Sequence, residues 1–207
     1  MAEVTIIEGA DANAIADWLE TRLAAALNAS DGVVAITVPG GSTPFPIMEQ
    51  LVERDLDWSR VTVWPGDDRI VPEDHEASNT GKVRALFEPA GAQVCALTEG
   101  SMPPRFAIAW LGMGGDGHIA SLFPNTDPQV DDSQVVRRLT PDPLPPHAPF
   151  DRITLTIPAL VNADDLLFTL GGASDKREVF DGAVAAEHDL PIARLLGAAN
   201  QKVACFA

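Results

Sequence analysis

Nearly continuous apolar runs, separated by segments with helical periodicity, constrain the fold of this 207-residue chain most strongly. Residues 33–38, 105–112 and 165–172 contain such runs, and glycines stand at or near the end of each. A strand that is apolar at almost every position belongs in a parallel sheet covered on both faces, because a strand exposed on one face alternates apolar and polar residues. Residues 11–30 place apolar side chains at helical spacing. The alternation predicts an α/β fold with a mostly parallel sheet and helices on both faces.

The same alternation continues along the chain and predicts a single domain over residues 1–207. Further strands are predicted at residues 60–64, 152–158 and 202–207, and further helices at residues 77–90, 174–186 and 191–199. The interval 124–149 holds seven prolines and is predicted to be an irregular surface loop. We do not place a domain boundary there, because the strands on both sides of it are needed for one sheet.

The balance of charge restricts the partners of the chain. Thirty acidic residues against 14 basic ones give a formal net charge of −16, and such a surface repels nucleic acid and anionic membranes. A phosphorylated substrate would need several of the few basic residues gathered in one pocket. No apolar run approaches the ~18 residues of a membrane span, and the N-terminus lacks a signal-peptide pattern. Cys95 and Cys205 stand alone, so neither a disulfide framework nor a zinc site is predicted. We expect a cytoplasmic protein, and nothing in the sequence points to an obligate protein partner.

A glycine-rich turn follows the first apolar run at residues 39–44 (PGGSTP). Ser42 or Thr43 suits the N-cap of a helix and Pro44 suits its first position. Gly40 and Gly41 allow a ligand to approach the backbone, and the free N–H groups of the helix start form a natural phosphate site. A capped turn that binds nothing fits this stretch equally well.

Two acidic residues and an arginine stand at the end of the next strand. Ligand-binding groups of α/β folds lie at the carboxyl ends of strands. Arg69 is therefore a candidate phosphate ligand, with Asp67 or Asp68 as a base or an orienting group. The alternative is a solvated loop with a local ion pair. His75 lies between two acidic residues and is predicted to be a surface residue rather than a metal ligand.

Residues 111–124 (LGMGGDGHIASLFP) contain the G-x-G-x-x-G spacing of a dinucleotide-binding loop. That interpretation needs a full crossover helix after the third glycine, and Pro124 leaves too little room for one. We predict instead that Asp116 caps a short helix over residues 118–123, with free N–H groups nearby that form an oxyanion hole. His118 then lies in the first turn, where the helix dipole lowers its pKa and favours a neutral general base. The alternative is a structural histidine that bonds within its own loop.

Basic residues lie at the predicted start of a later helix. Ser174 is predicted as its N-cap, which places Lys176 and Arg177 in the first turn, where cations oppose the helix dipole. A bound anion would remove that conflict and makes Lys176 a candidate phosphate ligand; a solvated pair of bases is the alternative. Together these segments predict proton-transfer or water-mediated chemistry on a small phosphorylated molecule, without a metal.

Five motifs occur in an order that resembles the 6-phosphogluconolactonases: VPGGSTP, GDDR with the following IVP, His and SN, LGMGGDGHIASLFP, RITLTIPAL, and GG with the following SDK. The resemblance runs from about Val33 to Phe180. It implies a Rossmann-like α/β fold shared with glucosamine-6-phosphate deaminases and ribose-5-phosphate isomerases. It also implies hydrolysis of 6-phospho-D-glucono-1,5-lactone to 6-phosphogluconate, the second step of the oxidative pentose phosphate pathway, with no metal or other cofactor.

The resemblance also implies roles for particular residues. His118 resembles the general base that activates water, and Asp116 resembles a partner that orients it. Asp67 matches the proton-transferring aspartate of the related deaminases. The implied phosphate-binding set consists of Gly40, Gly41, Ser42, Thr43, Arg69, Arg152 and Lys176. The usual Asp-Glu-Arg of the family appears here as Asp67-Asp68-Arg69.

Two alternatives remain open at the level of the sequence. Glucosamine-6-phosphate deaminases carry a glutamate five residues after the motif histidine, whereas this chain has Phe123 there. A sugar-phosphate-sensing module of a transcription regulator shares the fold, but it should carry a helix-turn-helix and a basic face. The segment before Val33 is acidic and offers room for little beyond one helix.

Overall fold

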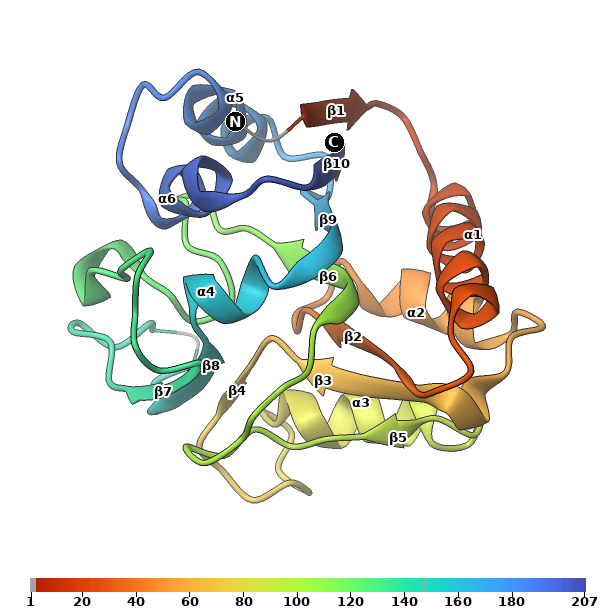
Figure 1. The fold of residues 1–207 in the computed structure, drawn as a ribbon. Helices are drawn as coiled ribbons and strands as arrows, with labels where there is room; N and C mark the ends of the chain where they lie inside the picture. Colours follow the sequence, from red (N-terminus) through yellow and green to blue (C-terminus); the bar gives the residue numbers. More distant parts are fainter. Residues whose placement is uncertain (1–2, 147) are drawn as a thin grey trace.

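Two sheets organise the protein in the computed structural model, which describes residues 3–146 and 148–207. The larger sheet has seven strands in the order β1-β10-β9-β6-β2-β3-β5, and every neighbouring pair is parallel (Figure 1). Its strands are β1 (Glu3–Ile7), β2 (Val34–Val38), β3 (Val61–Pro65), β5 (Gln93–Val94), β6 (Phe106–Gly112), β9 (Ala163–Thr169) and β10 (Lys202–Phe206).

Helices cover both faces of this sheet (Figure 1). They are α1 (Ala12–Ala29), α2 (Phe45–Val52), α3 (Asn79–Phe87), α4 (Ile157–Leu160), α5 (Ser174–Val184) and α6 (Pro191–Ala198). Buried residues of α1, α2 and α3 form one apolar cluster with the sheet, and those of α4, α5 and α6 form a second cluster on the other face. The predicted α/β sheet with helices on both faces is confirmed.

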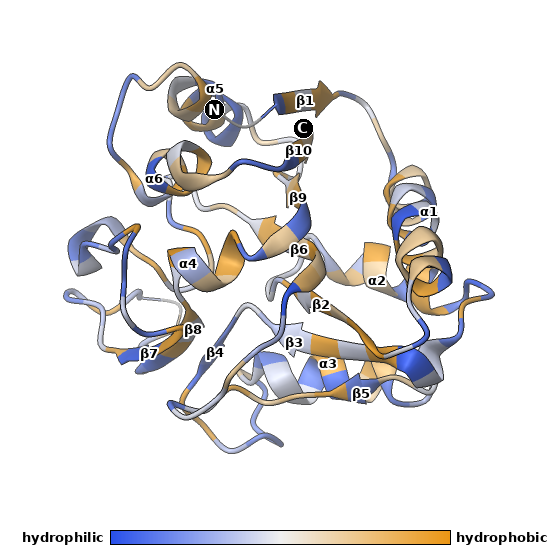
Figure 2. Ribbon diagram, viewed as in Figure 1, coloured by the Kyte–Doolittle hydropathy of each residue, from blue (hydrophilic) through white to orange (hydrophobic). Residues whose placement is uncertain are grey.

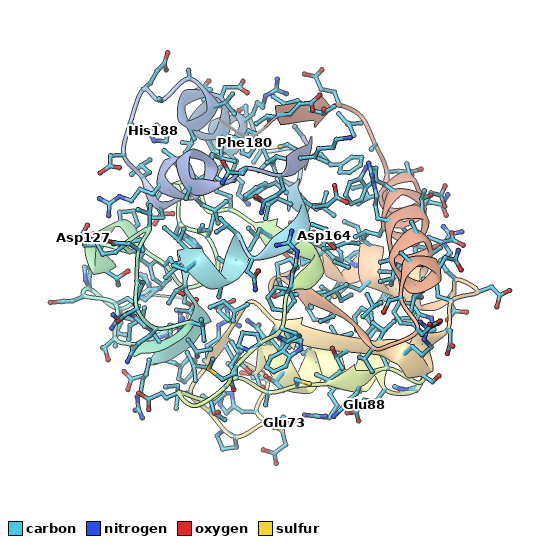
Figure 3. The ribbon with its side chains drawn as sticks, viewed as in Figure 1. Glu73, Glu88, Asp127, Asp164, Phe180 and His188 are labelled. Carbon is cyan, nitrogen blue, oxygen red and sulfur yellow. The ribbon has the colours of Figure 1, made fainter. Side chains whose placement is uncertain are left out.

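The apolar runs exist because the central strands bury both of their faces. In β6, Ile108 and Trp110 point into one cluster, whereas Ala109 and Leu111 point into the other. Figure 2 shows β2 and β6 as largely apolar. Phe180 of α5, labelled in Figure 3, packs on β9 from the second side.

The second sheet is small, antiparallel and ordered β4-β8-β7. Its strands are β4 (Asp67–Arg69), β7 (Val136–Leu139) and β8 (Arg152–Leu155). The prediction that residues 152–158 add a strand to the single main sheet was therefore wrong, since among the described residues β8 pairs with β4 and β7 and with no strand of the larger sheet. The proline-rich interval 124–149 is also not wholly irregular. It contains the 3₁₀ helix η2 (Pro124–Thr126) and β7, whose Val136 is buried opposite Leu155.

Side-chain caps fix the start of helices α1 and α3, and α3 contributes Asn79 to the site described below. The Asp11 carboxylate accepts a hydrogen bond from the N–H of Ala14 at the start of α1, 2.8 Å away. The Ser78 hydroxyl accepts one from the N–H of Gly81 at the start of α3, 3.0 Å away. A capping side chain satisfies one of the N–H groups that a helix start leaves unpaired. Over residues 3–146 and 148–207, no helix is both long and apolar enough to cross a membrane.

Candidate active site

A cavity of about 290 Å³ lies where the chain leaves the carboxyl ends of β2, β6 and β9. Carboxyl ends of parallel strands meet at one edge of a sheet, and segments that are distant in sequence converge there. The lining consists of the loop 39–44, Asp67, Arg69, Asn79, Gly112, Met113, Gly114, His118, Ala120, Thr169 and Lys176. The structure thus brings together most of the residues that the sequence proposed, but neither Asp116 nor Arg152 lines the cavity.

The His118 imidazole is held by Asp116, two residues earlier in the chain. Its Nδ1 lies 2.6 Å from Oδ1 of Asp116, and the backbone N–H of His118 donates to the same oxygen over 3.2 Å. The hydrogen bond from His118 holds the pKa of the Asp116 carboxyl below its usual range. A carboxylate at Nδ1 favours the tautomer with its proton on Nδ1, which leaves the Nε2 lone pair free to accept a proton.

The predicted helix over residues 118–123 does not form, and that prediction was wrong. The N–H of Gly114 donates to the carbonyl of His118 over 3.0 Å, and the N–H of Leu122 donates to that of Ile119 over 2.9 Å. Both are turn contacts, and Ala120 between them has a left-handed φ of 49°. The Asp116 carboxylate is bound to His118, so it does not cap a helix. The expected helix-dipole effect on His118, and an oxyanion hole formed by helix N–H groups, therefore have no basis here.

Phe123 packs against the His118 imidazole. The two ring centroids are 4.7 Å apart, and the ring planes are inclined by 34°. Phe123 is the residue at which the resemblance would lead us to expect a glutamate in a deaminase, and here an apolar ring lies beside the histidine. This contact restricts the imidazole on one face, while Asp116 fixes it at its edge.

The glycine-rich loop after β2 fits closely against its surroundings. Gly41 has a φ of 95°, which side chains other than glycine rarely tolerate. A Cβ on Gly40 would overlap the side chain of Asn79, and a Cβ on Gly171 would lie 2.9 Å from Oγ1 of Thr43. The predicted cap was wrong: α2 begins at Phe45 after Pro44, and neither Ser42 nor Thr43 caps it. Both line the cavity instead, which is where a phosphate-binding role of the loop 39–44 (the phosphate loop) would need them.

Asp67 is buried, and its carboxylate connects β4 to residues 113–123, the histidine loop. The Ser121 hydroxyl donates to Oδ2 of Asp67, and the backbone N–H of Ser121 donates to Oγ1 of Thr154 on β8 over 3.2 Å. Burial raises the pKa of the Asp67 carboxyl above its usual range, although the Ser121 hydrogen bond and the Arg69 charge act against this shift. Asp67 therefore joins two loops of the cavity through a carboxylate whose ionised form is disfavoured.

Replacing Asp67 with asparagine is expected to make the protein more stable than wild type, by a margin that grows as the pH rises. A carboxyl whose folded-state pKa is raised adds stability below its unfolded value of 3.8 and loses it as the pH passes through the folded-state pKa. Asp67→Asn removes this loss. The free energy of unfolding, measured with urea from about pH 4 to pH 8, should increase relative to wild type across that range. Asp31→Asn, at an exposed carboxylate, is the control, and a difference independent of pH would contradict the expectation.

Asp68 has a structural role that differs from that of its neighbour. Its carboxylate accepts hydrogen bonds from the N–H groups of Asn79 (2.6 Å) and Thr80 (2.9 Å) and from the Ser78 hydroxyl (3.1 Å). It thus occupies the N-terminus of α3. The sequence left open whether Asp67 or Asp68 serves the site, and only Asp67 lines the cavity. The predicted surface position of His75 agrees with its exposure.

The predicted basic ligands divide into two groups. Arg69 and Lys176 line the cavity. Arg152 is buried nearby, where its guanidinium donates to the carbonyls of Ala148 and Phe150, 2.8 Å from each. Its assignment to the phosphate set stays a prediction. Arg177 lies away from the cavity and pairs with carboxylates of Glu8 and Asp181, at 2.8 and 2.9 Å.

The predicted N-cap of α5 was wrong by one residue. The N-cap of α5 is Ala173, and Ser174 is the first helical residue. Lys176 still lies in the first turn, as predicted.

Asn79 was not identified as a site residue from the sequence. It joins the cavity from the start of α3, and the only signal for it was its place in the SN motif that follows the acidic loop. No group of three His, Cys, Asp or Glu side chains is placed to hold a metal ion within the described residues.

Comparison with known proteins identifies the family of this chain. A family model described as "Glucosamine-6-phosphate isomerases/6-phosphogluconolactonase" matches residues 8–101 and 88–204. The chain belongs to this family. Among curated members, a 6-phosphogluconolactonase of Pseudomonas aeruginosa is 36% identical, with 90% of this chain and 87% of the relative covered. One from Neisseria meningitidis is 32% identical, with 94% and 92% covered.

Solved structures of the family share the fold. A 6-phosphogluconolactonase from Shewanella baltica is 26% identical, with a TM-score of 0.82 and with 100% of this chain and 98% of that chain covered. One from Thermotoga maritima has a TM-score of 0.83 and covers 100% and 99%, but at 22% identity it shows the fold alone. The resemblance inferred from the motifs is therefore confirmed at the level of family and fold.

Proposed function

We propose that this chain is a 6-phosphogluconolactonase, which hydrolyses 6-phospho-D-glucono-1,5-lactone with water activated by His118. The observation that carries the proposal is the His118 imidazole at the cavity, with Nδ1 on the Asp116 carboxylate and with no hydrogen-bond partner for Nε2 among the described residues. An imidazole held in this tautomer presents Nε2 as the proton acceptor that a general base needs. The curated relatives with this name support the substrate class.

In the proposed reaction, Nε2 of His118 removes a proton from water as its oxygen attacks the lactone carbonyl carbon. The tetrahedral intermediate collapses with cleavage of the bond between that carbon and the ring oxygen. The imidazolium returns a proton to the departing ring oxygen, so the histidine ends neutral. The products are a free hydroxyl and a carboxylic acid, which ionises in water. Asp116 stabilises the transient imidazolium, as a carboxylate at Nδ1 does in other histidine bases.

The phosphate is proposed to bind to the loop 39–44 together with Arg69 and Lys176. These two cations and the backbone N–H groups form a local cationic site in a chain with a net charge of −16. Opposite charge gathered in a cleft attracts an anionic substrate against a repulsive background. We also propose, on family grounds, a cytoplasmic enzyme that needs no cofactor.

Lys176→Ala is expected to raise KM for the phosphorylated lactone about tenfold to a hundredfold, with a smaller change in kcat. A hydrogen bond to a charged group contributes about 1.5–3 kcal/mol, and this one is made equally in the ground and transition states. Steady-state kinetics test the prediction, with the exposed Lys82→Ala as the control. An unchanged KM would remove Lys176 from the phosphate site.

The activity itself is tested with purified protein and freshly made lactone, after subtraction of spontaneous hydrolysis. Acceleration of hydrolysis supports the proposal. Release of ammonia from glucosamine 6-phosphate without lactone hydrolysis would favour the deaminase, although Phe123 offers no ionisable group for that reaction. Binding of the sugar phosphate without any turnover would favour a sensing module.

A further inference from the structure

We propose that Asn79 is a positioning residue whose side-chain amide holds the Arg69 guanidinium in the cavity and so sets the preference for a phosphorylated substrate. This inference rests on the proposed function. Asn79 is 2% exposed, and α3 presents it to the floor of the cavity. It is not required to touch the reacting atoms, because its effect passes through Arg69.

The amide of Asn79 is fixed by contacts at both of its ends. Oδ1 accepts a hydrogen bond from Nη1 of Arg69 over 3.0 Å, and Nδ2 donates to the backbone carbonyl of Asp67 over 3.0 Å. The backbone N–H of Asn79 donates to Asp68 over 2.6 Å. These contacts admit one orientation of the amide, with its oxygen toward Arg69. Asn79→Ala would remove both the acceptor for Nη1 of Arg69 and the amide donor to the Asp67 carbonyl.

Arg69 lines two cavities, so a contact is needed to keep its guanidinium in the active-site cavity. Besides the active-site cavity, it borders a second one of about 320 Å³, which Asp68 of β4 also lines. Glu73, labelled at the lower edge of Figure 3, and Glu99 line that second cavity. The Glu73 carboxylate is paired with Arg84, whereas the exposed Glu99 carboxylate is a competing partner for a guanidinium. Within residues 3–146 and 148–207, the Arg69 side chain makes one hydrogen bond besides that to Asn79, from Nη1 to the carbonyl of Ala77, 3.0 Å away.

Asn79 also lies against the phosphate loop. A Cβ on Gly40 would overlap its amide, so the glycine allows the loop to pack directly on Asn79. One side chain therefore contacts two of the groups that are proposed to bind the phosphate, the loop 39–44 and Arg69. Loss of the amide should weaken recognition of the phosphate, whereas Asp116 and His118 keep their own contact.

The test compares two substrates, 6-phospho-D-glucono-1,5-lactone and the unphosphorylated glucono-1,5-lactone. Asn79→Ala is expected to raise KM for the phosphorylated lactone about tenfold, which corresponds to about 1.4 kcal/mol. The loss of activity on the unphosphorylated lactone should be clearly smaller, because that substrate has no phosphate for Arg69 to bind. In the Arg69→Ala background, adding Asn79→Ala should have no further effect, because residues that act as one unit are not additive.

Ser78→Ala is the matched control, since it disturbs the same helix start and the same Asp68 carboxylate but has no contact with Arg69. It should reduce thermal stability and leave the ratio of the two lactone activities unchanged. If Asn79→Ala does not fold, Asn79→Ser gives the same readout, because a serine hydroxyl is too short to reach Arg69. An equal loss on both lactones, or additive effects with Arg69→Ala, would overturn the proposal.

Binding of inorganic phosphate, measured by calorimetry, separates this inference from the proposed function. If wild type binds phosphate but does not hydrolyse the lactone, the proposed function fails while the role of Asn79 is still tested. A weaker affinity in Asn79→Ala than in Ser78→Ala supports the inference. Equal affinities in the two variants, or no phosphate binding by wild type, overturn it.

Discussion

Replacing His118 with alanine is expected to lower kcat for 6-phospho-D-glucono-1,5-lactone by about 10²–10⁴-fold, the usual contribution of general acid–base catalysis. The variant loses the Nε2 acceptor and, with it, the Asp116–imidazole contact of 2.6 Å. The His118 side chain is about one-third exposed and forms no part of either apolar cluster. Its removal should therefore leave the fold intact. Initial rates are measured with the spontaneous hydrolysis subtracted.

His188→Ala is the control for this substitution. His188 lies between α5 and α6 (Figure 3), and its Nε2 contacts the carbonyl of Val179 at 2.9 Å, outside the cavity. It should keep kcat close to that of wild type. A loss of no more than about tenfold in His118→Ala would exclude His118 as the general base. The pH–rate profile adds a second readout, since the limb that belongs to the base should disappear only in the His118 variant.

The parts of the fold that could be predicted from the sequence are those in which burial alone decides the structure. β2, β6 and β9 bury both faces, and their composition shows it. Helix α1 was predictable because its apolar spacing and its Asp11 cap agree. Strand β4 could not be predicted, because Asp67, Asp68 and Arg69 have no apolar periodicity. Its extended form comes from pairing with β8, more than eighty residues later.

The histidine loop failed as a prediction for a related reason. Residues 118–123 have an acceptable helical composition, and Asp116 is a good N-cap by type. In the folded protein, however, Asp116 binds His118, and Ser121 binds Asp67 from β4. These tertiary contacts hold the segment as a turn and override its local preference. No local pattern reports them.

The candidate site was predictable to the extent that topology determines it. Loops after parallel strands converge at one edge, so the loop 39–44, Asp67 and His118 could be placed together from the sequence. The role of Asn79 could not, because it depends on an amide that reaches Arg69 across ten residues and on the packing of Gly40. Contacts of this kind need coordinates.

Replacing Gly114 with alanine is expected to lower kcat about 10²-fold, the effect of a displacement of ~1 Å in a catalytic group. A Cβ at this position would overlap the His118 ring and lie 2.6 Å from Oδ1 of Asp116. Gly114 has no left-handed φ, so alanine fits the backbone and the effect is steric. Steady-state kinetics test the prediction, and thermal unfolding checks the cost of overpacking, about 1–3 kcal/mol.

Gly115→Ala is the matched control on the same turn. Its Cβ would meet Oδ2 of Asp175, at 2.9 Å, which is the mobile end of a surface side chain. The carboxylate can move aside, so kcat should change far less than in Gly114→Ala. Equal losses in both variants would show that the turn, rather than the position of the imidazole, determines the rate.

A double variant decides whether Gly114 acts through the histidine. If the alanine Cβ slows the reaction only by displacing the imidazole, Gly114→Ala should cost nothing further once His118 is already alanine. The combined kcat would then equal that of His118→Ala, since substitutions that remove one shared interaction are not additive. A double variant slower than His118→Ala by the full effect of Gly114→Ala would contradict this route. In that case Gly114→Ala would slow the reaction by disturbing the turn, in which the N–H and the carbonyl of Gly114 both form hydrogen bonds.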